Sequence, residues 1–339
     1  MRFPLSLTLS MAAYIARKKL AGVKRFPLVL MLEPLHACNL TCTGCGRIRE
    51  YSTTIKDKLS VAECMKAVDE CGTPIVSICG GEPMIYPHIG ELVRKVLNRR
   101  KHVILCTNGM FIEKKLGEFR PTPRFSFNVH LDGLEETHDK AVEREGVFRA
   151  AVAGIKAAKA AGFRVTTNTT VYQETDLREI DRLFAYLTKL GVDNFMLSPA
   201  YGYAAVQTTN PTGAAEIFLT RDQITAKFKE AQKLLGKYRL AMTPVYMEFL
   251  SGQRDLHCTA WGNPTRNVKG WKGPCYLITD AHHKTFDGLM NDTDWSKYGR
   301  GKDPRCEHCM AHCGYEATAA VGGDARRGDL LKMMTWQMT

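Results

Sequence analysis

The chain has 339 residues, of which 45% are hydrophobic and 24% charged, and its formal net charge is +12. This length suits one large catalytic domain with a smaller appendage, and the composition is that of an ordinary globular protein. The positive charge suits nucleic acid, an anionic cofactor or an anionic membrane surface. The sequence has no dense Lys/Arg run and no nucleic-acid module, which argues against nucleic acid and favours the membrane surface.

Apolar runs alternate with segments of helical periodicity along the first two-thirds of the chain. The predicted strands are 28–32, 75–79, 103–106, 125–131, 163–171 and 194–197, and the predicted helices between them are 60–70, 88–99, 146–161 and 176–190. Ser60 and Glu63 have the spacing of a capping box at the start of the first of these helices. Strands that alternate with helices predict a parallel sheet. Six units are fewer than the eight of a closed barrel, so we expect an α/β fold, a partial (β/α)6 TIM-like barrel with its chemistry at the carboxyl ends of the strands.

The composition divides the chain into four predicted segments. They are an amphipathic N-terminal segment at 1–24, the barrel core at 25–220, a helix with a small Cys-rich C-terminal domain at 221–325, and a tail with little pattern at 326–339. In the first segment an apolar stretch precedes Arg17, Lys18 and Lys19, the reverse of the order in a secretory signal, and it is too short to span a bilayer. Two interpretations of this helix remain open: it lies on a membrane surface, or it packs against the bottom of the barrel.

Twelve cysteines are many for a chain of this size, and they are clustered. Clustered cysteines in a large chain favour metal binding in a reducing compartment over a disulfide framework. We therefore expect a cytoplasmic protein, peripherally associated with the inner membrane surface.

The densest cluster is Cys38, Cys42 and Cys45, spaced C-x3-C-x2-C in the loop after the first predicted strand. Three thiolates can hold three irons of a 4Fe–4S cubane and leave the fourth iron open for a ligand. A zinc loop is the alternative, with His36 as a fourth ligand.

Two strand ends carry further motifs. Gly80-Gly81-Glu82-Pro83 follows the second strand, and Thr107-Asn108-Gly109 follows the third. Together with the cysteine triad these motifs resemble the radical S-adenosylmethionine (SAM) superfamily. The resemblance implies that SAM binds the open iron, that one electron cleaves it to methionine and a 5′-deoxyadenosyl radical, and that the protein orients the cofactor. It also implies a one-electron donor such as flavodoxin or ferredoxin.

On the fourth strand Ser126, Asn128 and His130 share one face, which indicates a polar pocket around SAM unless this face lies at a solvent-exposed sheet edge. Asn168 on the fifth strand and Arg144 are weaker candidates, and Arg144 could pair with the SAM carboxylate. Asn108-Gly109 could equally be a plain turn. The predicted SAM-binding residues are therefore Gly80, Gly81, Glu82, Pro83, Asn108, Ser126, Asn128, His130, Arg144 and Asn168.

A narrower resemblance extends over nearly the whole chain. The segments 26–35, 258–267, 274–277 and 306–318 are similar to the adenosylhopane synthase family of bacterial hopanoid biosynthesis. That resemblance implies addition of the 5′-deoxyadenosyl radical to the alkene of diploptene, a triterpene, to give adenosylhopane. The alternative is a radical SAM enzyme of another class, a peptide maturase or a cofactor-biosynthesis enzyme with an auxiliary cluster. A third interpretation is an iron–sulfur electron carrier or redox sensor, and a carrier needs far less structure than this chain has.

Two further predictions concern the other cysteines. Cys106 ends the third strand without a cysteine neighbour at ligand spacing, so we expect a catalytic hydrogen-atom donor, with a buried structural cysteine as the alternative. In the C-terminal domain a second site could use Cys258, Cys275, Cys306, Cys309 and Cys313. A second iron–sulfur cluster would suit them, and the alternatives are a zinc site or reduced structural cysteines.

Overall fold

The computed structural model describes residues 2–203, 205–206, 214–322 and 324–338. Its centre is a nine-stranded sheet in the order β6-β5-β4-β3-β2-β1-β7-β8-β9. The six strands of the expected barrel are all parallel to their neighbours. They are β1 (Val29–Leu32), β2 (Ile75–Ile78), β3 (His102–Thr107), β4 (Phe125–His130), β5 (Arg164–Val171) and β6 (Asn194–Pro199). The expected partial barrel of six parallel strands is confirmed.

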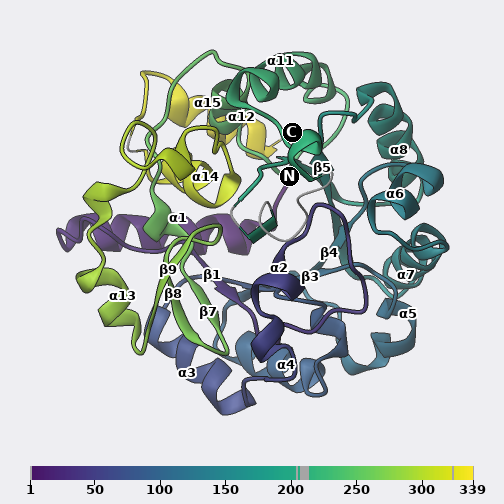
Figure 1. Ribbon diagram of the computed structural model, residues 1–339, viewed down its shortest axis with the longest axis horizontal. Helices are drawn as coiled ribbons and strands as arrows, with labels where there is room; N and C mark the ends of the chain where they lie inside the picture. The colour runs from purple at the N-terminus through teal and green to yellow at the C-terminus, as the bar shows by residue number, and fades with distance from the viewer. Residues whose placement is uncertain (1, 204, 207–213, 323, 339) are drawn as a thin grey trace.

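Helices lie around the outside of this curved sheet (Figure 1). Those that alternate with the strands are α3 (Val61–Cys71), α4 (Ile89–Asn98), α5 (Ile112–Lys115), α6 (Glu135–Ala141), α7 (Val147–Ala160) and α8 (Leu177–Lys189). Helix α3 begins at the Ser60 capping box and ends at Gly72, whose φ of +68° stops the helix in a left-handed turn. Buried aliphatic and aromatic side chains fill the space between the strands and these helices.

The second half of the chain extends the sheet and closes its open side. Helices α10 (Ala214–Ile217), α11 (Arg221–Ala231), α12 (Pro244–Leu250), α13 (Phe286–Asp292) and α14 (His312–Val321) are accompanied by strands β7 (Thr265–Asn267), β8 (Gly270–Pro274) and β9 (Thr279–His283). Strand β7 pairs in parallel with β1, and β8 and β9 continue the sheet antiparallel. The sequence indicated only a small Cys-rich domain here, because these strands are short and do not alternate, and β8 contains two glycines.

Both ends of the described chain are helical. Helix α1 (Leu5–Leu20) packs Met11, Tyr14 and Ile15 in a small cluster with Ala317 and its neighbours on α14. The tail, which shows little pattern as a sequence, contains helix α15 (Asp329–Met338). Within the described residues, no helix combines the length and the apolar character needed to cross a membrane.

Candidate active site and cysteine pocket

The three cysteines of the triad lie in the loop between β1 and the short helix α2 (Arg47–Glu50), at the carboxyl end of β1. Glu143 clamps this loop: its carboxylate accepts hydrogen bonds from the hydroxyls of Thr41 at 3.1 Å and Thr43 at 3.0 Å. The backbone N–H of Cys45 donates to the carbonyl of Cys42 at 3.0 Å. The loop is therefore held in shape by the protein itself.

The triad thiols are half-buried, and their chemistry fits an iron–sulfur cluster. Burial raises the pKa of Cys38 to about 12 and raises that of Cys42 further, and neighbouring cysteines add to both shifts. Thiols buried in this way lose their protons only beside strong positive charge, which a cluster supplies. Among the described residues, no three Cys, His, Asp or Glu side chains converge closely enough to hold a single metal ion.

The Gly-Gly-Glu-Pro motif lies against the backbone just before the triad. A Cβ on Gly81 would lie 1.9 Å from the carbonyl oxygen of Ala37, and one on Gly80 would lie 2.5 Å from that of Leu35. Gly80 also has φ +116°, a conformation that side chains rarely adopt. The glycines thus let the end of β2 touch the cluster loop. The sequence suggests that glycine is needed here to let SAM approach. The structure adds a second reason, which is the close approach of the neighbouring backbone.

Glu82 joins the ends of β2 and β3. Its carboxylate accepts hydrogen bonds from Met84 N–H at 2.8 Å, the Thr107 hydroxyl at 2.7 Å and Asn108 N–H at 2.8 Å. Burial raises the pKa of Glu82 to about 7, although these three hydrogen bonds oppose the shift. Asn108 in turn donates from Nδ2 to Asn39 Oδ1 at 2.9 Å, inside the cluster loop. Glu82 and Asn108 therefore position the loop, and buried Pro83 begins the short 3-10 turn that follows.

The polar face of β4 points into the barrel. Strand β4 lies between β3 and β5, so the alternative of a solvent-exposed sheet edge does not hold. Ser126, Asn128 and His130 are half-buried, and the intervening side chains are buried. Asn128 Oδ1 is buried and has no hydrogen-bond partner among the described residues. An unpaired buried acceptor is costly, so this atom fits a polar ligand such as SAM.

Cys106 lies beside this face. It pairs in register with Asn128 across β3 and β4. Its Sγ is 3.4 Å from the Ser77 hydroxyl, and Asn128 Nδ2 donates to it at 3.7 Å. Burial raises the pKa of the Cys106 thiol, and the contacts with Ser77 and Asn128 only partly oppose that shift. The hydrogen therefore stays on sulfur at neutral pH.

The remaining candidates have different surroundings. His130 Nε2 lies 2.8 Å from the buried Asp132 carboxylate, which raises the pKa of His130 against the effect of burial. Asn168 Oδ1 accepts a hydrogen bond from the Ser198 hydroxyl at 2.9 Å, on β6. Arg144 is exposed and reaches the Asn39 carbonyl at 3.4 Å. All three side chains lie at the carboxyl-end rim, and their contacts with SAM stay a prediction.

A buried charge network next to the cluster loop was missed by the sequence analysis. Arg47 Nη2 lies 3.1 Å from Glu33 Oε1, and Arg47 Nη1 lies 3.1 Å from Glu50 Oε2. Lys272 on β8 lies 3.0 Å from Glu50 Oε1 and donates to the Tyr276 carbonyl at 2.8 Å. Arg47 also donates to that carbonyl at 3.1 Å. The network ties the segment after Cys45 to the segment after Cys275.

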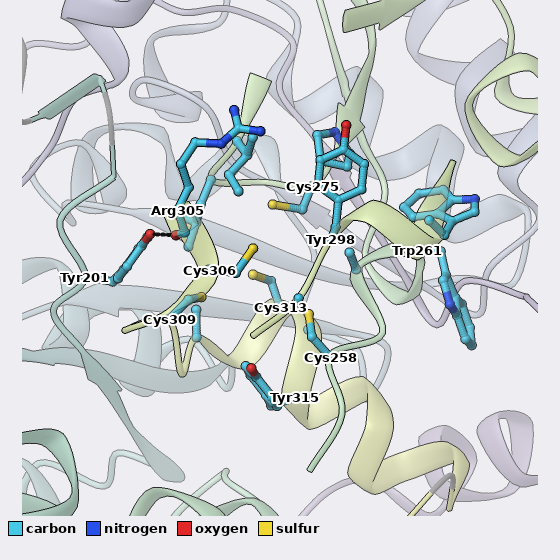
Figure 2. A pocket seen from close by; sticks show the side chains of 18 residues that line it. Tyr201, Cys258, Trp261, Cys275, Tyr298, Arg305, Cys306, Cys309, Cys313 and Tyr315 are labelled. Atoms are coloured by element: carbon cyan, nitrogen blue, oxygen red, sulfur yellow. Dashed lines mark hydrogen bonds between the residues drawn. The ribbon is translucent and has the colours of Figure 1, made fainter. Parts of the chain in front are cut away.

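The five C-terminal cysteines line one cavity of about 70 Å³. Figure 2 shows their sulfur atoms around the same space, beside the side chains of Trp261, Tyr298 and Tyr315. The cysteines come from four separate segments: Cys258, Cys275, Cys306 with Cys309, and Cys313 on α14. Burial raises the pKa of Cys309 to about 12, and the neighbouring Cys275 and Cys306 add to the shift. The structure thus brings together all five residues that the sequence proposed for a second site.

Comparison with known families divides the chain into two matches. Residues 32–187 match the radical SAM superfamily, and residues 195–333 match a domain of unknown function, DUF3463. The first match contains the cysteine triad, Gly80-Gly81-Glu82-Pro83, Cys106 and the polar face of β4. The second contains the cysteine pocket.

Named relatives are similar over different lengths. An AdoMet-dependent heme synthase of Methanosarcina barkeri is 32% identical over 170 residues, 49% of this chain and 48% of that protein. The chain thus spans about half the length of such curated relatives. The antilisterial bacteriocin subtilosin biosynthesis protein AlbA of Bacillus subtilis is 25% identical over 311 residues, 86% of this chain and 66% of that protein. Neither of these relatives is an adenosylhopane synthase, so the narrower resemblance stays a proposal.

Among solved structures, SuiB of Streptococcus suis superposes with a TM-score of 0.64 at 16% identity, over 88% of this chain and 75% of that one. Native anSMEcpe with bound AdoMet superposes with a TM-score of 0.56 at 15% identity, over 92% of this chain and 97% of that one. At these identities the likeness shows the fold alone.

Proposed function

The chain is a member of the radical SAM superfamily through residues 32–187, and we propose that it adenosylates the alkene of a triterpene, diploptene. The superfamily brings a 4Fe–4S cluster and SAM, and Cys38, Cys42 and Cys45 are the residues that would hold the cluster. The reaction proposed here forms a carbon–carbon bond and gives adenosylhopane. It rests on the resemblance of the segments at 26–35, 258–267, 274–277 and 306–318 to adenosylhopane synthases, and on one observation in the site.

That observation is the position of the Cys106 thiol at the rim of the barrel. Its neighbours Ser77 and Asn128 fix it on the inner face of the sheet, beside the polar side chains of β4. A reaction that ends with hydrogen abstraction from substrate needs no hydrogen donor from the protein. Radical addition to an alkene does need one, because it leaves a carbon radical that must gain a hydrogen atom.

When bound, the reduced cluster and SAM supply a 5′-deoxyadenosyl radical. Addition at the terminal alkene carbon forms the new C–C bond, breaks the π bond and leaves a tertiary carbon radical. The S–H of Cys106 gives that carbon a hydrogen atom from one face, which sets the new stereocentre. The resulting sulfur radical takes up one electron, from a donor of the flavodoxin or ferredoxin class, and one proton to restore the thiol.

Replacing Cys106 tests this assignment. With SAM, a reductant and diploptene, we expect Cys106→Ala and Cys106→Ser to cleave SAM while the yield of adenosylhopane falls or its stereochemistry becomes mixed. Cys64→Ala is the matched control, because Cys64 is a buried thiol on α3, outside the site. Mass spectrometry of the lipid extract and chiral analysis of the product give the readout. Full yield of one unchanged stereoisomer from both Cys106 variants would assign the hydrogen to another source.

The second candidate is a radical SAM enzyme of another class, a peptide maturase or a cofactor-biosynthesis enzyme with an auxiliary cluster. The named relatives back this candidate better than the first, because they include a heme synthase and a bacteriocin biosynthesis protein similar over 86% of the chain. The five-cysteine cavity suits the auxiliary cluster. One outcome would favour this second candidate: the wild-type protein contains two clusters and cleaves SAM, but forms no adenosylated lipid.

A further inference from the structure

The exposed large hydrophobic side chains of the described residues lie at the two ends of the chain. Helix α1 and the segment after it hold Leu5, Leu9, Leu20 and Val23, which are 37–88% exposed. Helix α15 holds Leu330, Leu331, Met334 and Met338, which are 55–76% exposed. Large apolar side chains that gather in one region mark an interaction site more often than scattered ones do.

The exposed side chains of the two ends lie on neighbouring parts of the molecule, because the start of α1 is bound to the end of α15. Arg2 N–H donates to the Gln337 carbonyl at 3.0 Å, and Gln337 Nε2 donates to the Phe3 carbonyl and the Thr8 hydroxyl, both at 2.9 Å. The rings of Phe3 and Trp336 lie 5.7 Å apart. We call the exposed face of α1, α15 and residues 21–25 the terminal-helix surface.

The exposed stripe of α1 is separate from the face by which the helix packs. Met11, Tyr14 and Ile15 lie against α14, which occupies one side of α1. The opposite stripe is entirely apolar and exposed, with a helical period. Its members are Leu5, Leu9, Ala12, Ala13, Ala16 and Leu20. The packing of α1 on the rest of the protein, which the sequence left as an alternative, is therefore present and leaves this stripe uncovered.

Positive charge is concentrated on the same surface. Residues 1–25 contain six cations and no acidic residue, which is half of the net charge of +12. Arg2 is buried, and the other five, which are wholly or partly exposed, are Arg17, Lys18, Lys19, Lys24 and Arg25. Arg326 and Arg327 are exposed just before α15. Two copies of this chain docked through this surface would bring the same cations together, whereas an anionic bilayer would attract them.

We propose that the terminal-helix surface docks on an anionic lipid bilayer, with the apolar stripe in the acyl boundary and the flanking cations at the headgroups. An open cavity of about 500 Å³ lies beside it, lined by Leu235, Pro244, Leu331 and Trp336 among others, and its apolar wall suits a lipid chain. The inference is independent of the substrate proposed above.

Docking through this surface leaves the candidate active site free. The carbonyl of Arg2 accepts hydrogen bonds from Arg164 at 3.0 Å and Asn194 at 2.9 Å, and these residues begin β5 and β6. The terminal-helix surface therefore lies at the amino ends of these strands. The cysteine triad and Cys106 lie at the opposite, carboxyl ends.

Co-sedimentation of the full-length, cluster-loaded protein with vesicles tests the proposal. The vesicles are phosphatidylcholine alone, or phosphatidylcholine with about one-third phosphatidylglycerol. We expect binding to the anionic vesicles that weakens at high salt, and much weaker binding to the neutral ones. Lys24→Glu with Arg25→Glu should lower partitioning onto anionic vesicles by about tenfold or more. Leu5→Gln with Leu9→Gln should also lower it, because the apolar contact is lost while helix propensity is kept.

The matched control is Lys114→Glu with Lys189→Glu, the same change of charge at exposed sites on α5 and α8. This control should bind as the wild type does, and all variants should retain SAM cleavage, which shows that they are folded. Absence of binding to anionic vesicles, or an equal loss of binding in the control, would overturn the proposal. So would light scattering that shows a dimer dissociated by the Leu5 and Leu9 changes, because a second copy would then cover the surface.

Discussion

Gly81 has no room for a side chain, because a Cβ at this position would lie 1.9 Å from the carbonyl oxygen of Ala37. The same oxygen accepts a hydrogen bond from the Glu82 N–H at 2.9 Å, so moving it away would break that hydrogen bond. We predict that Gly81→Ala displaces the cluster loop. Overpacking of this kind costs about 1–3 kcal/mol of folding stability, occasionally more. Iron content and 5′-deoxyadenosine production should both fall several-fold.

Gly117→Ala is the control for this substitution. Gly117 lies in the 3-10 turn Leu116–Glu118, and a Cβ there would meet nothing within 4 Å. Iron content and SAM cleavage should stay at the wild-type level. Equal behaviour of the two alanine variants would mean that the contact between the glycine motif and the cluster loop is unimportant.

The cysteine triad gives a second prediction at the level of single residues. Changing Cys38, Cys42 or Cys45 to alanine should abolish SAM cleavage and leave the protein folded. The reason is that the two remaining thiolates are too few to retain a 4Fe–4S cluster. Circular dichroism tests the fold, and chromatography of 5′-deoxyadenosine tests the chemistry. Near wild-type cleavage by any one of the three variants would remove that residue from the set of cluster ligands.

Residues in short motifs were predictable from the sequence, and residues joined only by the fold were not. Cys38, Cys42 and Cys45 fall within eight residues of one another, so their spacing alone indicated a shared site. Arg47 donates a hydrogen bond to the carbonyl of Tyr276, which lies 229 residues further along the chain. Arg47 and Lys272 also share the carboxylate of Glu50. No local pattern marks such a pair, because nothing in the sequence shows that β8 returns beside α2.

At the level of elements, the strands of the barrel were predictable from their apolar residues. These either alternate with polar ones or form a continuous run, and the burial of the strands follows the same pattern. Strand β4 alternates buried and half-buried residues along Phe125–His130, and all four residues of β2 are buried. Strand β8, Gly270–Pro274, is fully buried as well, but its two glycines and its proline are not typical of a strand, so the sequence did not indicate one. Its pairing comes from its neighbours, β7 and β9, rather than from its own preference.

Helix α14 carries a prediction of pH dependence. Burial raises the pKa of Glu316 to about 7, although its carboxylate accepts hydrogen bonds from the Thr243 N–H at 2.7 Å and hydroxyl at 3.0 Å. A carboxyl whose pKa is higher in the folded state contributes stability that is complete at pH values below its unfolded pKa, near 4.5. That contribution is lost as the pH rises through 7. The full shift corresponds to at most about 3 kcal/mol.

We therefore expect the wild type to lose stability relative to Glu316→Gln between pH 5 and pH 8, since glutamine keeps an acceptor for the Thr243 N–H and does not titrate. Urea midpoints of both proteins at several pH values give the measurement. Glu230→Gln, at an exposed position on α11, is the control and should follow the wild type. Parallel stability profiles of wild type and Glu316→Gln would show that Glu316 ionises alike in the folded and unfolded states.

At the level of the whole molecule, the charge network around Arg47 connects the two halves of the chain. Arg47 is 4% exposed and Lys272 is fully buried, so Arg47 needs the carboxylates of Glu33 and Glu50, and Lys272 needs that of Glu50. Removing one partner of such a network leaves an uncompensated buried charge. Because Arg47 follows the cysteine triad and Lys272 precedes Cys275, the two cysteine sites are held in a fixed relation by the fold.

The last prediction concerns how much iron the molecule holds. If the cavity lined by the five C-terminal cysteines takes a second cubane, fully reconstituted protein should contain about eight irons per chain, and otherwise about four. Cys306→Ala with Cys309→Ala should lower the content to about four and preserve the cluster on the triad, because the two sites share no ligand. The control is Cys64→Ala with Cys71→Ala, two buried thiols of α3 outside both sites, which should keep the wild-type iron content. Close to four irons in the wild type, with zinc absent by elemental analysis, would leave the five cysteines as reduced structural thiols.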